Sequence, residues 1–578
     1  MNTLIIINYQ IIWDVLNALR SHDERLTREI EHLKFQKPPG GQHPGGDGEE
    51  DVSPESGKHI IICGGQTDLS HFLAGNALRG ALFAKMVEKV GDRDYLGVWA
   101  RKVACVAGNV EDRLRTLLQN PRVNDDFHEF VRSLQKSINP NVDANQAVEM
   151  LTQHMLTKPV FEALFEDYSF ISENPISQSM QKMIAILEAN AFEKETESLG
   201  PFYKRIQQRI QRYPSEGRQE VIRTLYSDFF TTAFPKMASQ IGIAYTPIPI
   251  VDFILQSIND VLKEEFDRTL SDEGVHILDP FVGTGSFLVR MFEMNLLQEE
   301  DMTRKYSHEI HANEIALLPY YIAAINIENA YFAKMPAGTP YYSCPGICLA
   351  DTFQMMEWDE EKEGKEHLDR SQFPLTSEQI TKQKKTPITV ILGNPPYSAG
   401  QKAANDNAQN LEYPKLEEKI GKTYAEDSTA TSKKPLYDSY IKAFRWATDR
   451  LDKNGGIIGF ITNGGWLDGS AMDGFRKHLA KDFSSIYVFN LRGRKGSTDD
   501  MRRVEGRNIF EYPGKSGGCT TTVSIVILVK NSAHIGECNI IYADISAFGD
   551  YLKGDEKREI IRNLKSFSNI SQDKLQRI

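Results

Sequence analysis

Short, strongly apolar runs that alternate with helical stretches dominate the second half of the chain. A short apolar run bounded by turn residues is typical of a strand that is buried on both faces of a sheet. Runs of this kind separated by helices predict an α/β domain built on a largely parallel sheet. They occupy residues 275–278, 388–392, 456–461 and 523–529. Ligands bind at the carboxyl ends of the strands in such sheets, so the residues after each run are the first candidates for a functional site.

The chain is long enough for two or three domains, because 578 residues exceed what one hydrophobic core usually supports. The expected N-terminal segment is 1–35, in which residues 10–35 have apolar residues at helical spacing and predict one amphipathic helix. Residues 36–58 have the Gly, Pro and acidic composition of a flexible linker. We further expect an α-helical domain at 59–235, the α/β domain at 236–535 and a truncated C-terminal segment at 536–578.

The charge of the chain limits which partners it can bind. A net charge of −12 argues against general binding to polyanions, since non-specific affinity for DNA comes mainly from Lys and Arg side chains. Any contact with nucleic acid is therefore expected to be local. One segment is basic with few acids among its residues, although a solvated basic loop explains it equally well. Its basic residues are Arg492, Arg494, Lys495, Arg502, Arg503 and Arg507.

The sequence predicts no membrane segment, secretory signal or metal site. Every apolar run is shorter than the roughly 18 to 20 residues that span a bilayer, and the N-terminus lacks a basic flank and a cleavage site. The six cysteines are few and scattered, which fits reduced thiols in the cytoplasm. Cys344 and Cys348, the close pair, are expected to be buried and structural. His308 and His311 lack the H-E-x-x-H spacing of a zinc site.

A glycine-rich turn follows the run at 275–278. It reads Asp279-Pro280-Phe281-Val282-Gly283-Thr284-Gly285. Closely spaced glycines let a strand turn sharply into a helix and let the backbone approach a ligand. The turn is not the full G-x-G-x-x-G fingerprint, so a purely structural turn stays open. The candidate ligand-binding residues are Asp279, Phe281, Gly283 and Gly285.

Two acids occupy the ends of the next expected strands. Glu314 follows residues 306–312, which we expect to be the second strand, and nucleoside-binding sheets offer a carboxylate to ribose hydroxyls at this place. Asp351 follows another apparent strand and is suited to accept a hydrogen bond from an adenine amino group. A role in capping a helix or forming a turn is an open alternative for each acid.

The sequence Asn394-Pro395-Pro396-Tyr397 follows the run at 388–392 and is the most specific motif of the chain. Two prolines stiffen the loop and remove two backbone donors, which leaves carbonyl oxygens unpaired. The Asn394 amide oxygen and a rigid carbonyl can both accept hydrogen bonds from an amino group, which favours lone-pair density on its nitrogen. Tyr397 offers a ring on which a flipped-out base can stack. The polar segment at 398–434 predicts either a mobile flap or simple disorder.

These motifs, in this order, resemble those of the amino-methyltransferases that act on DNA adenine. The resemblance includes residues 455–466 and covers residues 241–530. It implies a Rossmann-like class I domain that depends on S-adenosylmethionine. By this resemblance, Tyr245, Thr246 and Pro247 hold the methionine part of S-adenosylmethionine together with residues 279–285. Glu314 is expected at its ribose and Asp351 at its adenine, while Asn394 and the Pro395 carbonyl hold the target N6 and Tyr397 stacks on the target base.

The helical half resembles the coupler of large single-chain, type ISP-like restriction-modification enzymes. In that family a nuclease and a helicase precede the coupler, the methyltransferase and a target-recognition domain. Residues 11–33 resemble the tail of the helicase and residues 69–235 the coupler. No G-x-x-x-x-G-K-S/T motif occurs, and the chain ends soon after the expected last strand. We therefore expect a truncated or split gene product that binds double-stranded DNA, with the helicase, nuclease and recognition segments supplied separately.

Two other functions stay open. Related loops with Asn-Pro-Pro-Tyr also methylate amides of protein or amines of RNA, and a catalytically silent fragment could survive as a DNA- or partner-binding module. Methylation at cytosine C5 is not expected, because it needs a Pro-Cys nucleophile and none of the cysteines follows a proline. The sequence predicts direct transfer of a methyl group to adenine N6, without a covalent enzyme intermediate, after the base leaves the duplex.

Overall fold

The computed structural model describes residues 6–8, 59–61, 106–164, 170–189, 246–336, 338–357, 372–397, 412–493, 505–511, 521–547 and 549–577. The chain divides into two compact units, Met1–Lys102 with Lys204–Ala233 and Val103–Tyr203 with Phe234–Ile578. In the first unit the described residues form β1 (Ile6–Asn8) and β2 (His59–Ile61), which pair antiparallel. The helix expected within 1–35 and the linker expected at 36–58 otherwise lie outside the described residues.

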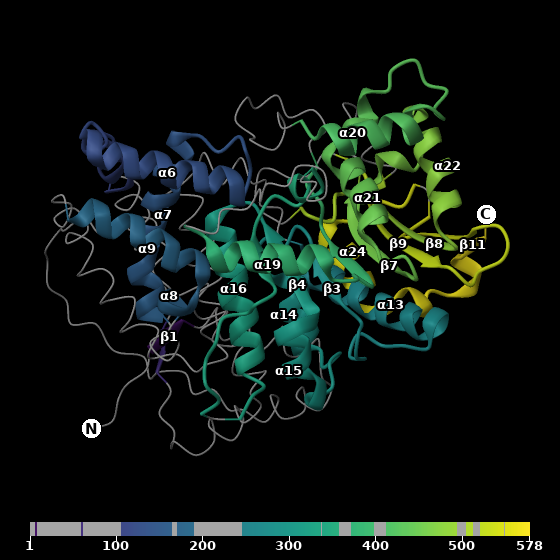
Figure 1. Cartoon of the computed structure of the whole chain (residues 1–578). Helices are drawn as coiled ribbons and strands as arrows, with labels where there is room; N and C mark the ends of the chain where they lie inside the picture. The colour runs from purple at the N-terminus through teal and green to yellow at the C-terminus, as the bar shows by residue number, and fades with distance from the viewer. Residues whose placement is uncertain are drawn as a thin grey trace, which may run out of the picture. The chain divides into compact units, whose positions relative to one another are not determined.

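The second unit is built on a sheet of nine strands (Figure 1). Its order from one edge to the other is β11-β10-β8-β9-β7-β6-β3-β4-β5. Strand β9 runs antiparallel to β7 and β8, β11 runs antiparallel to β10, and the remaining neighbours are parallel. The strands are β3 (Ile277–Asp279), β4 (Ile310–Glu314), β5 (Ile347–Leu349), β6 (Val390–Gly393), β7 (Gly455–Asn463), β8 (Ser485–Arg492), β9 (Val523–Asn531), β10 (Asn539–Asp544) and β11 (Gln576–Arg577).

The order of the strands reverses beside β3. Strand β4 lies on one side of β3 and continues to β5, whereas β6 lies on the other side and continues to β7. In open α/β sheets such a switch point forms the ligand crevice at the carboxyl ends of the strands. The predicted α/β class and the largely parallel sheet are confirmed, and the switch point brings the glycine turn after β3 next to the Asn-Pro-Pro-Tyr loop after β6.

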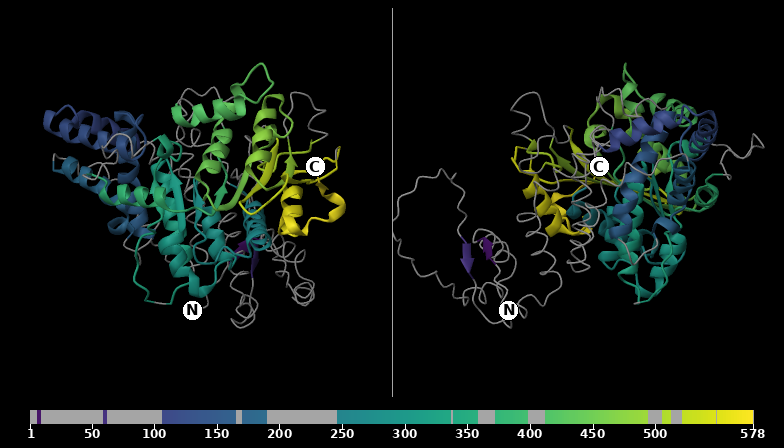
Figure 2. Two further views of the ribbon diagram at one scale, coloured as in Figure 1. Left: turned by 45° about the vertical axis from the view of Figure 1, so that its right-hand side comes forward. Right: turned by 90° about the vertical axis from the view of Figure 1, so that its left-hand side faces the viewer.

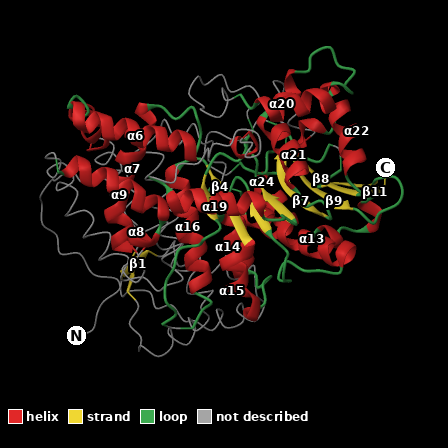
Figure 3. Ribbon diagram, viewed as in Figure 1, coloured by secondary structure: helices red, strands yellow, loops and turns green. Residues whose placement is uncertain are grey.

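Helices cover both faces of the sheet (Figure 3). Side chains alternate along β7: a β-carbon on Gly459 would lie 2.5 Å from Ile258 of α13, whereas the Phe460 ring contacts Phe444 of α21. These two helices therefore lie on opposite faces. The helices on the α13 side are α13 (Ile248–Phe266), α14 (Ser286–Glu293), α16 (Leu317–Phe332) and α24 (Gly554–Leu564), and those on the α21 side are α19 (Pro374–Lys385), α21 (Ser439–Arg450) and α22 (Asp473–Asp482).

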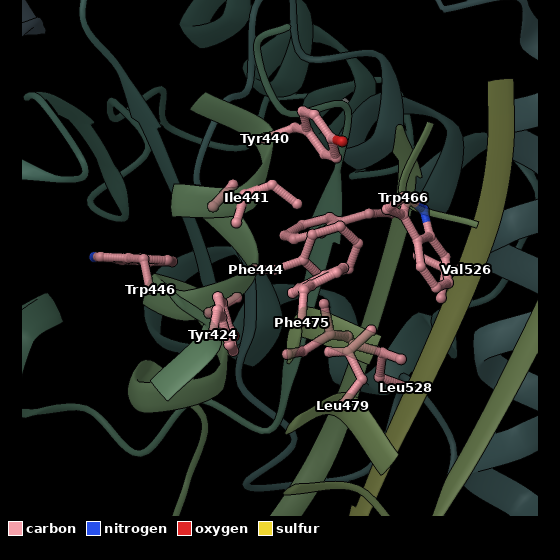
Figure 4. Close-up of a cluster of buried hydrophobic side chains, with 14 of the residues drawn as sticks. Tyr424, Tyr440, Ile441, Phe444, Trp446, Trp466, Phe475, Leu479, Val526 and Leu528 are labelled. Atoms are coloured by element: carbon pink, nitrogen blue, oxygen red, sulfur yellow. The ribbon is translucent and has the colours of Figure 1, made fainter. Parts of the chain in front are cut away.

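A large apolar core lies between the sheet and the helices on the α21 side (Figure 4). Phe444 of α21 forms edge contacts with the rings of Trp466 and Phe475, and Val526 and Leu528 of β9 close the cluster from the sheet. Burying a large apolar side chain stabilises the fold by roughly 1.5 to 3 kcal/mol relative to leaving it exposed. This core holds β6 and β7, and therefore the loop after β6, in a fixed position.

The described residues between 106 and 189 are helical, as the sequence predicts. Helices α6 and α9 both begin at an Asn-Pro pair, where the side chains of Asn120 and Asn174 accept hydrogen bonds from first-turn N–H groups and proline occupies the first helical position. These helices lie beyond β5, at the opposite end of the sheet from β11 (Figures 1 and 2). Their bounds are α6 (Pro121–Ser137), α7 (Ala144–Leu164), α8 (Phe170–Glu173) and α9 (Pro175–Glu188).

Three local expectations are wrong. Residues 306–312 do not form the second strand, because Lys305–Glu309 is a π-helix held by the buried Lys305, and β4 begins only at Ile310. The described residues of the expected flap, 412–434, contain α20 (Pro414–Ile420), whose Leu416 and Ile420 are buried in the core. The sheet does not end with the run at 523–529, since β10 and β11 extend it.

Candidate functional site

The glycine turn joins β3 to α14 at the carboxyl end of the sheet. Gly283 and Gly285 have φ angles of 54° and 85°, a left-handed conformation that residues with a β-carbon rarely adopt. Gly285 also allows α14 to approach α16, because a β-carbon there would lie 3.3 Å from backbone atoms of Ala323. The glycines are therefore required by the turn itself as well as by any ligand that the turn binds.

Asp279 is a buried acid at the end of β3, with 1% of its surface exposed. Its Oδ1 accepts the N–H of Phe281 at 3.1 Å, and its Oδ2 has no hydrogen-bond partner within the described segments. Gly393 of β6 makes room for this carboxyl group, since a β-carbon there would lie 2.7 Å from Oδ1. Burial, reinforced by the charge of Glu314, raises the pKa of Asp279 to about 8. An unpaired buried carboxyl oxygen is suited to accept a hydrogen bond from a ligand.

Glu314 is the last residue of β4 and supports the glycine turn directly. Its Oε2 accepts the N–H of Gly283 at 3.0 Å, and its Oε1 accepts the N–H of Ala316 at 3.0 Å. Burial raises the pKa of Glu314 to about 7. Ile315 supplies a third backbone hydrogen bond, so the carboxylate, which offers about four acceptor positions, retains capacity for a hydroxyl donor.

Asp351 follows β5, as expected, but the chain itself supplies donors to its whole carboxylate. Oδ1 accepts the N–H groups of Phe353 at 2.9 Å and Gln354 at 3.2 Å, and Oδ2 accepts hydrogen bonds from Asn139 and Tyr413. A carboxylate offers about four acceptor positions, so an adenine amino group would have to replace one of these donors. A direct bond from Asp351 to the cofactor stays a prediction.

The Asn-Pro-Pro-Tyr loop is organised by hydrogen bonds around its asparagine. The Tyr397 hydroxyl donates to Asn394 Oδ1 at 2.6 Å, and Asn394 Nδ2 donates to Thr246 Oγ1 at 3.1 Å. Thr246 and Pro247 lie just before α13, so the segment that opens the α/β part contacts the loop after β6. Pro395 is buried and Pro396 is exposed. The amide is thus held with its oxygen toward Tyr397 and its nitrogen toward Thr246.

The structure brings most of the predicted site residues to one end of β3, β4, β5 and β6. Tyr245 lies outside the described residues. Of the predicted basic segment, Arg492 forms an ion pair with Asp544 at 2.9 Å and Arg507 is exposed, while the other members lie outside the described part. Arg492 is therefore neither a solvated loop residue nor a free phosphate contact.

Residues that the sequence did not single out complete the site. The Thr352 hydroxyl donates to the Pro280 carbonyl at 2.6 Å and lies 3.2 Å from Asn313 Nδ2, so the ends of β3, β4 and β5 are bound together. Asn139 and Tyr413 contact Asp351 from elements far away in the sequence. The positions of Asn313 and Thr352 beside the two predicted acids were a usable signal, whereas nothing in the sequence marks Asn139.

The structure also bears on the expectations for metal sites, membrane segments and cysteines. Among the described residues, no group of three or more His, Cys, Asp or Glu side chains could hold a metal ion. Within the same segments, no helix is long and apolar enough to cross a bilayer. Cys344 and Cys348 are buried free thiols, as expected from their sequence context.

Two family models match separate parts of the chain. The coupler domain of type ISP restriction-modification enzymes matches residues 95–217, and the Eco57I restriction-modification methylase matches residues 311–495. The chain combines a type ISP coupler domain with an Eco57I-type methylase domain. We refer below to residues 106–189 as the coupler part and to residues 246–577 as the methylase part. The predicted resemblance to both modules is thereby confirmed.

Solved structures resemble both parts together. A nuclease-deletion mutant of the type ISP enzyme LlaGI, in complex with a DNA substrate mimic, is 39% identical with a TM-score of 0.77, and the match covers 99% of this chain and 42% of that one. The ATP-dependent type ISP enzyme LlaBIII bound to DNA is 41% identical with a TM-score of 0.78, covering 99% and 37%. DrdV in a complex with DNA is 30% identical with a TM-score of 0.72, covering 88% and 46%.

The chain thus spans less than half the length of these relatives, between 37% and 46%. No match was found among curated proteins.

Proposed function

We propose that this chain transfers a methyl group from S-adenosylmethionine to the N6 of adenine in DNA, as the methylase of a restriction-modification system. One observation carries the proposal. The Asn394 amide, fixed between Tyr397 and Thr246, lies at the switch point of the sheet beside Asp279, whose buried Oδ2 has no partner within the described residues. A substrate amine and a cofactor can therefore be held at adjacent strand ends.

The residues present fit S-adenosylmethionine. The unpaired oxygen of Asp279 can accept a hydrogen bond from the ammonium group of the methionine part. That part would lie against the turn that contains Phe281, Gly283 and Gly285. Glu314 has acceptor capacity for the ribose hydroxyls of S-adenosylmethionine. The turn at Asp351 would lie beside its adenine. Tyr245, Thr246 and Pro247 complete the methionine end in this proposal. When bound, S-adenosylmethionine supplies an electrophilic methyl group on a sulfonium.

The chain's own residues act on the target amine. An exocyclic amine conjugated to its ring is a poor nucleophile, and acceptors for both of its hydrogens favour lone-pair density on nitrogen. Asn394 Oδ1 and the Pro395 carbonyl supply these two acceptors. Oδ1 already accepts one bond from Tyr397 and has a second lone pair for the substrate. The Tyr397 ring stacks on the base once it has left the duplex.

DNA is proposed as the partner because of the relatives. LlaGI, LlaBIII and DrdV were each solved with DNA or a DNA mimic, and the similarity covers 88% to 99% of this chain. We propose that this chain likewise acts on double-stranded DNA in the cytoplasm. Helicase, nuclease and target-recognition segments beyond these 578 residues are proposed to act together with it.

The test is methylation of genomic DNA with tritiated S-adenosylmethionine, followed by nucleoside analysis. We expect label in N6-methyladenine with the wild-type chain and none above background with Asn394→Ala. Parallel reactions with RNA and with bacterial protein extract test the other amine acceptors. Label in protein or RNA alone, or equal adenine methylation by both chains, would refute the proposal.

A further inference from the structure

The carboxyl group of Asp351 connects three segments of the second unit: the turn after β5, the residues after α6 and the segment before α20. It is 3% exposed, and its Oδ2 accepts one hydrogen bond from the coupler part and one from the segment before α20. The donors are Asn139 Nδ2 and the Tyr413 hydroxyl, the latter at 2.9 Å. Asn139 and Tyr413 are themselves buried, with 3% and 2% of their surfaces exposed. A buried polar group that loses its hydrogen-bond partner is costly, so these bonds fix the position of the carboxyl group.

The coupler contribution is built into the end of α6. The helix ends at Ser137, the Ile138 carbonyl accepts the N–H of Asp351 at 3.4 Å, and the Asn139 side chain reaches the carboxylate of the same residue. Asn139 is oriented by its own Oδ1, which accepts the N–H of Asn141 at 2.8 Å. Backbone and side chain of the coupler part therefore both fix Asp351, the second residue after β5.

The Tyr413 contribution extends to the glycine turn through aromatic rings. The Tyr413 ring lies against Phe353 with 5.2 Å between centroids, and Phe353 lies against Phe281 with 5.4 Å between centroids. Phe281 belongs to the turn that the proposed function assigns to the cofactor. The turn after β5 is thus held by Asp351 on one side and by packed rings on the other.

We propose that Asn139 of the coupler part and Tyr413 are positioning residues of the cofactor site, which fix the turn after β5 through their shared hydrogen bonds to Asp351. The coupler is then a structural component of the cofactor site and not only a connection to other domains. This inference rests on the proposed function, because it assigns the adenine end of S-adenosylmethionine to that turn.

The test is calorimetric titration of the 578-residue chain with S-adenosylhomocysteine, the product form of the cofactor, which avoids turnover. Asn139→Ala and Tyr413→Phe should each raise Kd about tenfold, the scale of one buried hydrogen bond. The double variant should weaken binding by more than the product of the single effects, since Asp351 Oδ2 then loses both side-chain donors. Tyr413→Phe keeps the ring and its packing, so it reports on the hydroxyl even where Asn139→Ala unfolds.

Two further measurements separate positioning from simple loss of structure. Asn145→Ala removes the same side chain from an exposed place on α7, where it bonds Arg115, and should leave Kd unchanged. In methylation assays the two test variants should raise KM for S-adenosylmethionine about tenfold and change kcat by less than about twofold.

The outcomes are distinguishable. If the wild-type chain does not bind S-adenosylhomocysteine, the proposed function fails and the inference with it. The wild-type chain and the variants can also bind with the same Kd while a smaller fraction of the variant molecules binds. Asn139 and Tyr413 then only support folding, and the inference is overturned. A Kd equal to that of the wild type in both variants overturns it as well.

Discussion

At the scale of single residues, the most informative feature is a buried acid whose pKa is raised by its surroundings. Asp279 lies at the end of β3 with one oxygen bonded to Phe281 and the other unpaired within the described residues. Its pKa rises from 3.8 to about 8 because of burial and the nearby Glu314. The folded chain therefore binds this proton up to a higher pH than the unfolded chain does.

The raised pKa of Asp279 predicts how stability depends on pH. A carboxyl group with a raised pKa lowers the free energy of unfolding as pH rises, here between 3.8 and about 8, because the unfolded state releases the proton first. We expect the unfolding temperature of Asp279→Asn to fall less steeply over this range than that of the wild type. Scanning fluorimetry without ligand measures both curves. Asp468→Asn, at an exposed position, serves as the control, and parallel curves for Asp279→Asn and wild type would contradict the prediction.

The hydroxyl of Tyr397 should affect turnover more than DNA binding. It donates to Asn394 Oδ1 and so helps to orient the amide, whereas the ring is the part proposed to stack on the base. Tyr397→Phe should lower kcat about tenfold, the scale of one hydrogen bond, and leave KM for DNA within about twofold. Steady-state methylation kinetics test this, with Tyr437→Phe at an exposed tyrosine as the control. A variant with unchanged kcat would show that Asn394 is oriented without the hydroxyl.

At the scale of secondary-structure elements, the site depends on how closely helices approach the sheet. Thr246 and Pro247 lie just before helix α13, which crosses β7 at Gly459, where the absence of a β-carbon allows Ile258 to approach. The bond from Asn394 to Thr246 therefore depends on a contact made along the same helix. The close approach of α13 links packing at the middle of the sheet to geometry at its end.

A β-branched residue at Gly459 should move α13. A β-carbon there would lie 2.5 Å from Ile258 Cδ1, which is fully buried. We expect Gly459→Val to lower the free energy of unfolding by about 1 to 3 kcal/mol, as overpacked cores usually do. Chemical denaturation measures the change. Gly108→Ala, at an exposed helical glycine with no atom near the added methyl group, should instead be neutral or raise stability by up to about 1 kcal/mol. Equal stability of Gly459→Val and wild type would contradict the expectation.

At the scale of the whole molecule, the coupler and methylase parts share one compact unit. Buried hydrogen bonds connect them at several places: Asn174 donates to the Tyr320 hydroxyl at 3.1 Å, and His154 lies 2.8 Å from the Tyr321 hydroxyl. The Asn139 bond to Asp351 adds a third connection. Such contacts predict that the two parts unfold together and not as independent domains.

Asn174→Ala tests this cooperation. The side chain caps α9 and also bonds Tyr320 of the methylase part, so its loss should cost roughly 2 to 4 kcal/mol from the cap and the unpaired hydroxyl together. Hydrogen exchange should show faster opening of α9 and of the sheet strands by the same factor. Faster exchange confined to α9 would show that the coupler part opens by itself.

Much of the methylase part could be predicted from local sequence. The four apolar runs correspond to strands, because a buried strand needs a continuous apolar segment. The first three pair in parallel, as expected from the helices between them, whereas β9 runs antiparallel to its neighbours. The ends of β3 and β6 could be predicted for the same reason, and with them the positions of Asp279 and the Asn-Pro-Pro-Tyr loop. Glu314 and Asp351 also lie at or just after strand ends, as predicted, although β4 and β5 are not among these runs. The start of β4 was wrong because residues 306–309 belong to a π-helix that precedes the strand.

Only the tertiary structure decided how these strand ends are completed. The strand order places Asp279 beside Gly393, and it depends on long-range pairing that no local pattern encodes. The side-chain donors to Asp351 come from the residues just after α6 and from the segment before α20, and Asn139 is 212 positions away along the chain. The sequence therefore determined which residue types stand at the ends of the strands. Folding determined which of their oxygens remain open to a ligand, because that depends on buried partners brought together from distant elements.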